Sequence, residues 1–239
     1  MQGDPNFRRI LLKLSGESLM GPKDFGLHQK TINRICDEIK LILKNKIQIC
    51  LVIGGGNIFR GISQAAENFE RTSADYMGML ATVINAIAVQ NILESKGVET
   101  RVLSAIPMSP ICEAYNRKKA LRHLEEGRVI IFAAGTGNPL FTTDTAATLR
   151  ATEMNCDIML KGTLVDGIYD SDPKTNPKAK KYKTLKCDEA LKLGLNIMDT
   201  AAVTLARDHK IPVLVFSIME NNELLKVLNG EGNFTKLVP

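Results

Sequence analysis

Residues 49–57 read Ile-Cys-Leu-Val-Ile-Gly-Gly-Gly-Asn, an apolar and largely β-branched run that stops in three glycines. Such a pattern is typical of a buried strand whose carboxyl end meets an anion. Glycine has no Cβ, so the backbone N–H groups of residues 54–56 can come close to a phosphate. Phe-Arg-Gly follows at residues 59–61 and brings a guanidinium, which can hold phosphate oxygens bidentately. The stretch predicts a phosphate site, with a plain strand-to-helix turn as the alternative.

The composition narrows the class of protein. At 239 residues and 44% hydrophobic, the chain can bury a core without a disulfide or a metal, and we expect a single domain over residues 1–239. The five cysteines are odd in number and widely spread, which indicates reduced core thiols. The three histidines do not cluster, so no metal motif is predicted. A net charge of +5 without tryptophan suits small anionic ligands better than nucleic acid as the main partner.

The start of the chain does not resemble a signal peptide. Arg8 and Arg9 are followed by only a few apolar residues before Lys13. We expect no apolar run that approaches the roughly 18 to 20 residues of a membrane span. The sequence therefore predicts a cytoplasmic protein without a membrane partner.

Apolar runs and helical spacings alternate along the chain. Strands are predicted at residues 8–14, 48–53, 99–103, 128–133, 158–163 and, as the last strand, 213–216. Helices are predicted at residues 29–44, 75–94, 116–126 and 199–209, and another from about residue 143. A loop rich in proline and lysine is expected at residues 170–186. The alternation predicts an α/β fold with a mostly parallel sheet, because parallel strands need crossover connections.

Several predicted strands end in groups that bind phosphate. Lys13 closes the first strand and is followed by Ser15 and Gly16, while Lys161 lies near the end of another strand. Ligands bind at the carboxyl edge of an open α/β sheet, so these lysines are candidate phosphate ligands, with surface lysines as the alternative. Residues 135–144 read Gly-Thr-Gly-Asn-Pro-Leu-Phe-Thr-Thr-Asp and combine amides, hydroxyls and a helix N-terminus. That combination predicts a second anion site.

Three aspartates lie at or near predicted helix starts. Asp75 is expected to open the helix at residues 75–94, Asp199 to open the helix at residues 199–209, and Asp144 to follow Thr143. A carboxylate there is commonly a helix cap or a partner of the helix dipole. The functional alternative for Asp75 is a carboxylate that accepts hydrogen bonds from ribose hydroxyls.

The motifs that are absent also restrict the chemistry. G-x-G-x-x-G does not follow these strands and G-x-x-x-x-G-K-[ST] does not occur, so neither a dinucleotide-binding dehydrogenase nor a P-loop kinase is supported. More strand ends carry groups that bind phosphate than a single phosphate would require. Phosphoryl transfer is the reaction they serve best, and an acceptor that is already an anion needs no general base.

Motifs spread over nearly the whole chain resemble those of the bacterial UMP kinases, a branch of the amino acid kinase family. They lie at residues 13–17, 54–57, 59–61, 75–82, 135–144, 165–167, 172–173 and 206–209. The resemblance implies a three-layer αβα sandwich around a mostly parallel sheet. It also implies phosphoryl transfer from ATP to UMP in pyrimidine nucleotide biosynthesis, with Mg²⁺ accompanying ATP. UMP would lie on the N-terminal part, and ATP on the part that starts near residue 160.

The resemblance also implies roles for individual residues. Catalytic roles would fall on Lys13, Lys161, Asp144 and Asp199. ATP would be bound by Lys13, Leu14, Ser15, Gly16, Gly56, Arg60, Thr163, Tyr169 and Asp172. UMP would be bound by Gly55, Asp75, Thr136, Gly137, Asn138, Pro139, Leu140, Phe141, Thr142 and Thr143.

Assembly and regulation are implied in the same way. The resemblance implies a homohexamer, inhibition by UTP and a GTP effector. The effector segment would consist of Gly21, Pro22, Lys23, Asp24, Phe25 and Gly26. Asp24 departs from the family pattern, where glycine is frequent, so the sequence leaves open whether GTP activates.

Two other functions remain open at this stage. A kinase of the same fold that acts on a carboxylate, such as aspartate or acetylglutamate, would need a cationic clamp and no ribose carboxylate. A catalytically silent nucleotide-binding or storage protein would bind the nucleotide without turnover. Asp75 disfavours the first alternative, and the pair of Lys13 and Lys161 disfavours the second.

Overall fold

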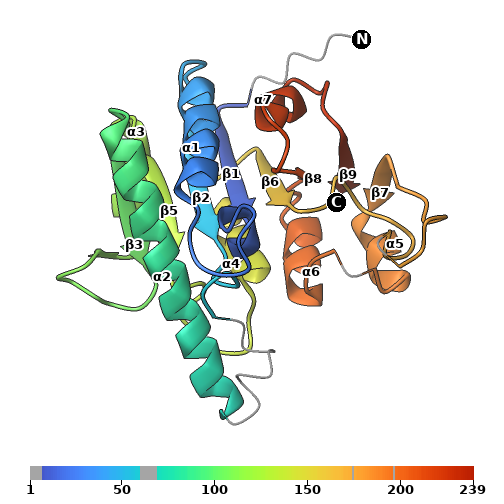
Figure 1. The fold of residues 1–239 in the computed structure, drawn as a ribbon, viewed down its shortest axis with the longest axis horizontal. Coiled ribbons are helices and arrows are strands. Elements are labelled where there is room, and N and C mark those ends of the chain that lie inside the picture. The colour runs from blue at the N-terminus through green and yellow to red at the C-terminus, as the bar shows by residue number, and fades with distance from the viewer. Residues whose placement is uncertain (1–6, 60–68, 174, 196) are drawn as a thin grey trace.

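The computed structural model describes residues 7–59, 69–173, 175–195 and 197–239. They form one nine-stranded sheet in the spatial order β4-β3-β5-β2-β1-β6-β8-β9-β7 (Figure 1). The strands are β1 (Arg9–Leu14), β2 (Gln48–Ile53), β3 (Thr100–Ser104), β4 (Glu113–Ala114), β5 (Val129–Ala133), β6 (Ile158–Thr163), β7 (Thr184–Lys186), β8 (Val213–Ser217) and β9 (Phe234–Val238). The helices are the 3₁₀ turn η1 (Gly16–Leu19), α1 (Gln29–Leu43), α2 (Arg71–Ser95), α3 (Arg117–Glu125), α4 (Thr143–Glu153), α5 (Cys187–Lys192), α6 (Thr200–Asp208) and α7 (Glu223–Leu228).

The sheet is mostly parallel. Among the described strands, every neighbouring pair runs parallel except β8 and β9, which pair antiparallel. β1 and β2 are joined through α1 and lie next to each other, as a strand-helix-strand unit requires. The predicted α/β architecture is confirmed.

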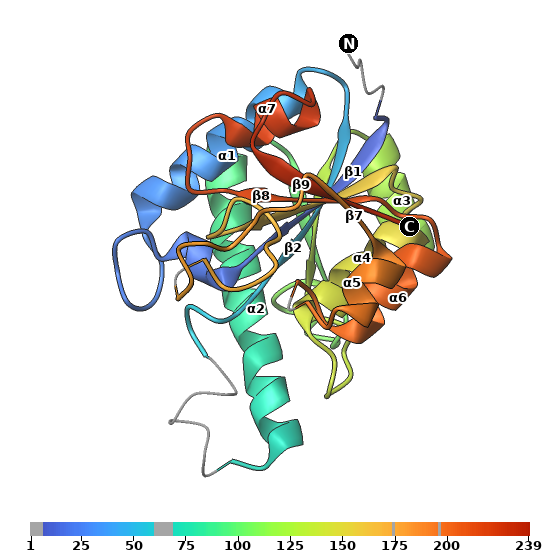
Figure 2. The same ribbon diagram turned by 90° about the vertical axis from the view of Figure 1, so that its right-hand side faces the viewer.

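Helices cover both faces of the sheet. One apolar cluster joins the sheet to α1, α2 and α7, and a second joins its opposite face to α3, α4, α5 and α6 (Figure 2). Successive side chains of a strand point to opposite faces, so Leu12 and Leu14 of β1 belong to the first cluster and Leu11 to the second. Lys13 therefore points toward the α4 side of the sheet. The three layers match the predicted αβα sandwich.

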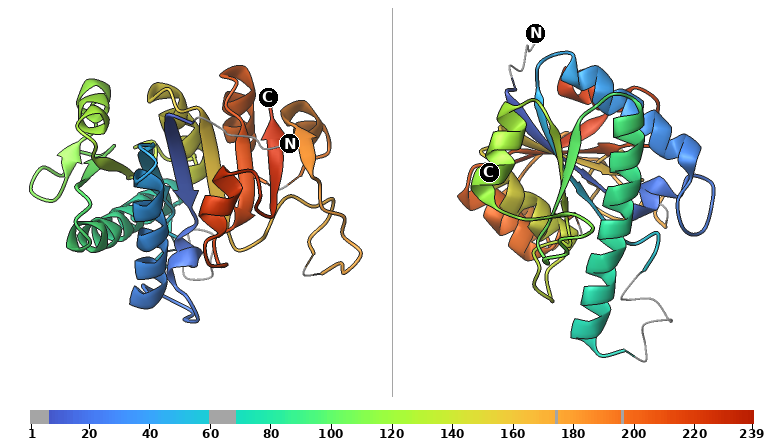
Figure 3. Two further views of the ribbon diagram at one scale, coloured as in Figure 1. Left: turned by 90° about the horizontal axis from the view of Figure 1, so that it is seen from above. Right: turned by 90° about the vertical axis from the view of Figure 1, so that its left-hand side faces the viewer.

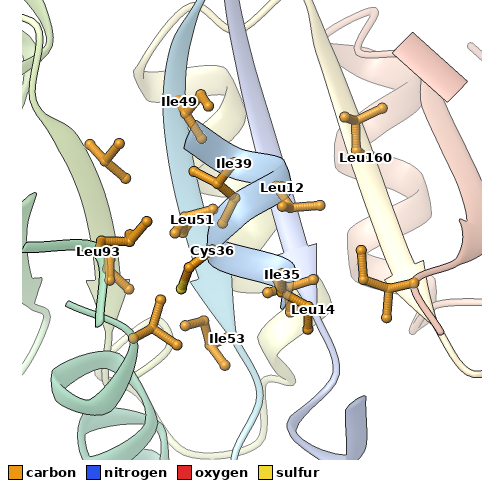
Figure 4. Close-up of a cluster of buried hydrophobic side chains, with 14 of the residues drawn as sticks. Leu12, Leu14, Ile35, Cys36, Ile39, Ile49, Leu51, Ile53, Leu93 and Leu160 are labelled. Atoms are coloured by element: carbon orange, nitrogen blue, oxygen red, sulfur yellow. The ribbon is translucent and has the colours of Figure 1, made fainter. Parts of the chain in front are cut away.

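The first cluster fixes the centre of the sheet. Figure 4 shows Leu12 and Leu14 of β1 beside Ile35 and Ile39 of α1, and all four side chains are buried. Burial of such a side chain contributes about 1.5 to 3 kcal/mol to folding. All five cysteines are free, and all but Cys112 are buried, as the sequence predicts.

Helix α2 differs from its prediction in two ways. It begins at Arg71, so Asp75 lies one turn inside the helix and does not open it. By length and composition alone it is also the one helix in the described part of the chain that is apolar enough to cross a membrane: an 18-residue window has a mean hydropathy of 1.4, and 44% of that window is buried in the protein. The expectation of no such segment was therefore wrong. The helix packs on β3, β5 and α1, while its N-terminal end extends past the sheet (Figure 3).

The C-terminal part contains elements that the sequence did not predict. Residues 213–216 were expected to form the last strand, but β9 follows and pairs with β8. The expected loop at residues 170–186 ends in the short strand β7, which pairs with β9. Both strands extend the sheet beyond β8 and complete its edge.

Candidate active site

A lysine from each of two neighbouring strands forms the centre of the site. Lys13 of β1 and Lys161 of β6 are partners in the parallel register, so their side chains leave the same face together. Asp144, in the first turn of α4, lies between them. Its carboxylate is 2.9 Å from Lys13 Nζ and 2.7 Å from Lys161 Nζ. The strand-end lysines and Asp144 thus come together, although more than a hundred residues separate Lys13 from the other two in the sequence.

The charges of this trio depend on one another. Burial by itself would raise the pKa of Asp144, but the ammonium groups of Lys13 and Lys161 outweigh it and hold that pKa at about 2. Burial lowers the pKa of Lys161, and Asp144 counteracts the shift. Asp144 therefore stays ionised at neutral pH and keeps the two lysines from repelling each other. The arrangement suits the binding of a negatively charged phosphoryl group between two cations.

Asp199 joins the beginnings of two helices. It caps α6 by accepting a hydrogen bond from the Ala202 N–H at 3.0 Å, which confirms its predicted place at the helix start. The same carboxylate accepts hydrogen bonds from the hydroxyls of Thr142 and Thr145 of the α4 region, the latter at 2.6 Å. Lys161 Nζ donates at 2.5 Å to the Ile197 carbonyl just before α6. Asp199 therefore links α4, which carries Asp144, to the start of α6. The Ile197 carbonyl, which accepts the hydrogen bond from Lys161, lies just before that start.

Sequence reasoning missed Thr145. The side chain is buried and lies three residues after Thr142, which shares its contact with Asp199. The signal available in the sequence was the run of threonines at residues 142, 143 and 145, since residues three apart lie on one face of a helix.

The loops after β1 and β2 approach each other backbone to backbone. The Gly54 N–H donates to the Leu14 carbonyl at 2.8 Å, so the second loop starts beside the end of β1. A Cβ at Gly16 would lie 2.7 Å from the Gly56 nitrogen and 2.5 Å from Asn57 Oδ1. No side chain fits at Gly16, and this explains why glycine stands there. Ser15 Oγ is buried and has no hydrogen-bond partner among the described residues.

The loop after β5 turns sharply and ends at a helix cap. Gly135 and Gly137 have φ values of +57° and +79°, which glycine adopts readily. Leu140 has a φ of +73°, an uncommon value for a leucine, and its N–H donates to Asp75 Oδ2 at 2.8 Å. Thr142 caps α4 by accepting from the Asp144 N–H. Asp75 of α2 is thus brought to the loop for which the family resemblance implies the same ligand.

The remaining residues of that loop are close to the protein surface. Asn138 bonds locally to Thr136, and Leu140 and Phe141 expose 66% and 50% of their surfaces. Pro139 and Thr143 complete the segment; a Cβ built on Gly54 would lie 3.6 Å from Thr143 Oγ1. The loops after β1, β2 and β5 therefore meet at one edge of the sheet, where the apolar side chains of Leu140 and Phe141 are exposed.

A cavity of about 550 Å³ continues from Lys161 toward the C-terminal part of the sheet. Its lining includes the predicted catalytic residue Lys161 together with Thr163, Tyr169 and Asp172, which were predicted to bind ATP. The Tyr169 hydroxyl donates to Asp166 Oδ1 at 2.7 Å, which fixes the ring at the cavity wall. Arg60 lies outside the described residues.

The predicted effector segment is attached to the second glycine loop. The Gly26 N–H donates to the Asn57 carbonyl at 2.8 Å, and Asn57 Nδ2 donates to the Gly26 carbonyl at 3.0 Å. Phe25 exposes 67% of its surface between Gly21 and Gly26, which both have positive φ values. Pro22, Lys23 and Asp24 are exposed as well. The segment therefore lies next to the site, and its role stays a prediction.

The described residues contain no group of three or more histidine, cysteine, aspartate or glutamate side chains that could hold a metal ion. Asp144 is the carboxylate at the centre, and its charge is already balanced by two lysines. Mg²⁺ retains several waters and is commonly held by one or two carboxylates together with substrate phosphates. The donor set fits an ion that arrives with a nucleotide and makes few protein contacts.

The chain belongs to the amino acid kinase family, whose sequence profile matches residues 8–217. Among its relatives, a uridylate kinase of Rickettsia bellii is 52% identical over 237 residues, covering 99% of both chains. A uridylate kinase of Cereibacter sphaeroides is 55% identical over 231 residues, covering 97% of this chain and 94% of the relative. The crystal structure of the UMP kinase from Bacillus anthracis superposes with a TM-score of 0.92 at 37% identity, covering 97% and 96% of the two chains. The family resemblance inferred from the motifs is confirmed.

Proposed function

We propose that this protein is a UMP kinase, which transfers the γ-phosphoryl group of ATP to UMP and yields ADP and UDP. The observation that carries the proposal is identity above 50% with uridylate kinases over nearly the full length of both chains. The fold and the converging loops described above support the same conclusion. The proposed role in the cell is a step of pyrimidine nucleotide biosynthesis in the cytoplasm.

In the proposed reaction, a phosphate oxygen of UMP attacks the γ-phosphorus while the bond to the β,γ-bridging oxygen breaks. The charge spreads over the equatorial oxygens of the transferred group, so catalysis depends on positioning and on nearby cations. Lys13 and Lys161 are the proposed cations, and Asp144 holds their ammonium groups in place. Asp199 fixes the helix that carries Asp144. Because the acceptor oxygen is already anionic, no side chain has to remove a proton.

We propose Mg²⁺ as the ion that accompanies ATP. When bound, it would neutralise charge on the β- and γ-phosphates. Asp144 and Asp199 are the carboxylates of the site that could contact it. Because Asp144 is already paired with two lysines, an ion held mainly by the nucleotide is the arrangement that we propose.

The two substrates are assigned to opposite sides of the lysine pair. UMP would lie against Gly55 and the loop after β5, with its ribose near Asp75. ATP would extend from Lys13 and Gly16 along the cavity lined by Thr163, with Tyr169 and Asp172 toward its adenosine. The cavity beside Lys161 supports this direction, because it leads away from the loop after β5.

An assay of ADP release with UMP, CMP, acetylglutamate and aspartate tests the proposal. We expect turnover with UMP. Activity confined to an amino acid would instead assign a carboxylate kinase of the same fold. Binding of UMP without turnover would identify a nucleotide-binding protein that is not an enzyme.

Assembly and regulation form a separate part of the proposal. We propose a homohexamer that UTP inhibits, with GTP as a second effector. An exposed apolar stripe on α2 supports contact between copies, because Tyr76, Leu80, Ile84 and Ile87 recur at helical spacing and each exposes between 37% and 50% of its surface.

A further inference from the structure

We propose that Thr82 and Asn85, on the buried face of α2, are positioning residues that fix the spacing between the two loops that bind UMP. The inference rests on the proposed function and assigns these residues a task within that site. Neither side chain is assigned a contact with the nucleotide. Each holds the backbone of a different loop.

Thr82 holds the start of the loop after β5. Its hydroxyl accepts a hydrogen bond from the Ala134 N–H at 2.8 Å and donates to the Met79 carbonyl of its own helix at 2.7 Å. Ala134 follows β5 directly and has a φ of +59°, which is unusual for a residue other than glycine. By accepting this hydrogen bond, the Thr82 hydroxyl satisfies the amide at the point where the chain turns into residues 135–142. Thr82 is 3% exposed, so water does not offer a substitute.

Asn85 holds the loop after β2. Its Nδ2 donates to the Gly54 carbonyl and to Asn57 Oδ1, both at 2.7 Å. Asn57 Nδ2 returns a hydrogen bond to Asn85 Oδ1 at 3.0 Å and also donates to the Gly26 carbonyl. Asn85 is fully buried and Asn57 is 2% exposed. A buried polar network with every amide hydrogen used is rigid, so it specifies one position for the glycine loop.

The two anchors belong to one rigid element. Residues three apart lie about 5 to 6 Å apart on the same face of a helix, so Thr82 and Asn85 impose a fixed distance on the loops that they hold. The backbone of the glycine loop also packs directly on α2. A Cβ at Gly55 would lie 2.7 Å from the Gly78 carbonyl and 3.2 Å from the Thr82 nitrogen. The helix therefore sets where Gly55 lies relative to the loop after β5.

This spacing matters because the ligand must reach both loops at once. Gly55 is assigned to the phosphate of UMP and residues 136–143 to the rest of the nucleotide. A displacement of about 1 Å that originates away from the chemistry can cost about 10²-fold in rate. The cavity assigned to ATP lies beyond β6, and neither Thr82 nor Asn85 lines it. Loss of the Thr82 anchor should therefore weaken UMP binding selectively, whereas the loop that Asn85 holds also carries Gly56, which is assigned to ATP.

The main test compares Thr82→Val, which removes the hydroxyl at constant volume, with Thr82→Ser, which keeps it. For Thr82→Val we expect the KM and the Kd of UMP to rise about 10- to 100-fold while the KM of ATP changes less than about twofold. Thr82→Ser restores UMP affinity. Thr152→Val is the matched control, because the Thr152 hydroxyl donates to the Thr148 carbonyl within α4 and holds no loop.

A second pair tests the other anchor. Asn85→Ala removes the hydrogen bonds to Gly54 and Asn57. We expect the KM of UMP to rise, together with a smaller rise in the KM of ATP, because the same loop carries Gly56. Asn33→Ala is its control, since Asn33 Nδ2 donates only to the Gln29 carbonyl in its own helix among the bonds described. If Asn85→Ala does not fold, the comparison of Thr82→Val with Thr82→Ser still decides.

The outcomes separate the inference from the proposed function. Wild-type protein without UMP-dependent ADP release would refute the function itself. With an active wild type, a Thr82→Val variant that melts at a lower temperature but keeps both KM values would show a purely structural hydroxyl and overturn the inference. Equal increases in the KM of ATP and of UMP would also overturn it, because they would indicate a general disturbance of the fold.

Discussion

Lys13 and Lys161 are held close together by strand register, with Asp144 between them. Two ammonium groups in a part-buried site would repel each other if that carboxylate were absent. Their proposed task is to stabilise the charge of the transferred phosphoryl group. Two consequences can be measured at the scale of single residues.

Replacing Lys13 with alanine should lower kcat strongly. Loss of one preorganised electrostatic donor at a transition state typically costs a factor of roughly 10² to 10³. Steady-state kinetics of Lys13→Ala measure the loss, and Lys30→Ala is the control because Lys30 is an exposed residue of α1. An unchanged kcat in Lys13→Ala would remove Lys13 from the mechanism.

The stability of the protein in acid should depend on Asp144. Its folded pKa of about 2 lies below the ordinary value of 3.8, so its contribution is present above pH 3.8 and is lost as the pH falls through 2. That difference corresponds to about 2 kcal/mol. Denaturant titrations from pH 5 to pH 2 should show the wild type losing about that much more free energy of unfolding than Asp144→Asn. Parallel curves for the two proteins would contradict the shifted pKa.

At the scale of elements, the loops after β1 and β2 are too close for any side chain at Gly16. A Cβ there would overlap the Gly56 nitrogen at 2.7 Å and the Gly54 carbonyl at 2.8 Å. Both obstacles are backbone atoms, which cannot rotate away. The two loops can therefore approach this closely only while residue 16 is glycine.

Gly16→Ala should both destabilise the protein and impair ATP binding. Overpacking of this kind typically costs about 1 to 3 kcal/mol. Thermal unfolding and the KM of ATP measure the two effects. Gly78→Ala is the stability control: a Cβ at Gly78 meets nothing within 4 Å, and alanine in a helix interior gains about 0.5 to 1 kcal/mol over glycine. A Gly16→Ala variant as stable as the wild type would contradict the packing described.

The elements differ in how well the sequence predicts them. β1, β2 and β6 each contain an uninterrupted apolar run, at residues 10–12, 49–53 and 158–160, because both faces of these strands are buried, and such runs are readily predicted. β9 was missed because only Thr235 and Leu237 of this strand are buried, while Lys236 is exposed. The start of α2 was missed because its first turn, Arg-Thr-Ser, is polar.

The site likewise contains residues that the sequence predicts and residues that it does not. Lys13, Lys161 and the glycine loops follow from the rule that ligands bind at strand ends, so sequence alone indicates them. Thr82 and Asn85 lie inside an apolar helix and contact residues that are far away in the sequence. The sequence shows that both residues are polar. Their hydrogen-bond partners can be identified only from the structure, in which the helix is packed on the sheet.

At the scale of the whole molecule, the exposed apolar stripe on α2 is best explained by contact with another copy of the chain. Its four residues point away from the core that the same helix helps to form. Contiguous exposed apolar side chains on a protein surface commonly mark an interaction site. We expect a second copy of the chain to cover this face.

Ile84→Asp should weaken assembly. A charge in the middle of the stripe must be desolvated when the face is covered, which costs several kcal/mol without a partner. Size-exclusion chromatography with light scattering should show smaller particles than for the wild type. Leu41→Asp, at a 39% exposed position of α1, is the control and should leave the particle size unchanged. Identical masses for Ile84→Asp and wild type would assign the stripe another role.

The trio of Lys13, Asp144 and Lys161 holds two positive charges and one negative charge in a part-buried place. The trio by itself therefore carries one positive charge in excess before any nucleotide arrives, and the nearby Asp199 offsets it through its electrostatic interaction with Lys161 without forming a described ion pair. An uncharged drug-like molecule seated there would leave an ammonium without a counterion in direct contact, where solvent screens it poorly. We expect inhibitors that reach this centre to need an acidic group, and neutral compounds to bind only in the cavity beside it.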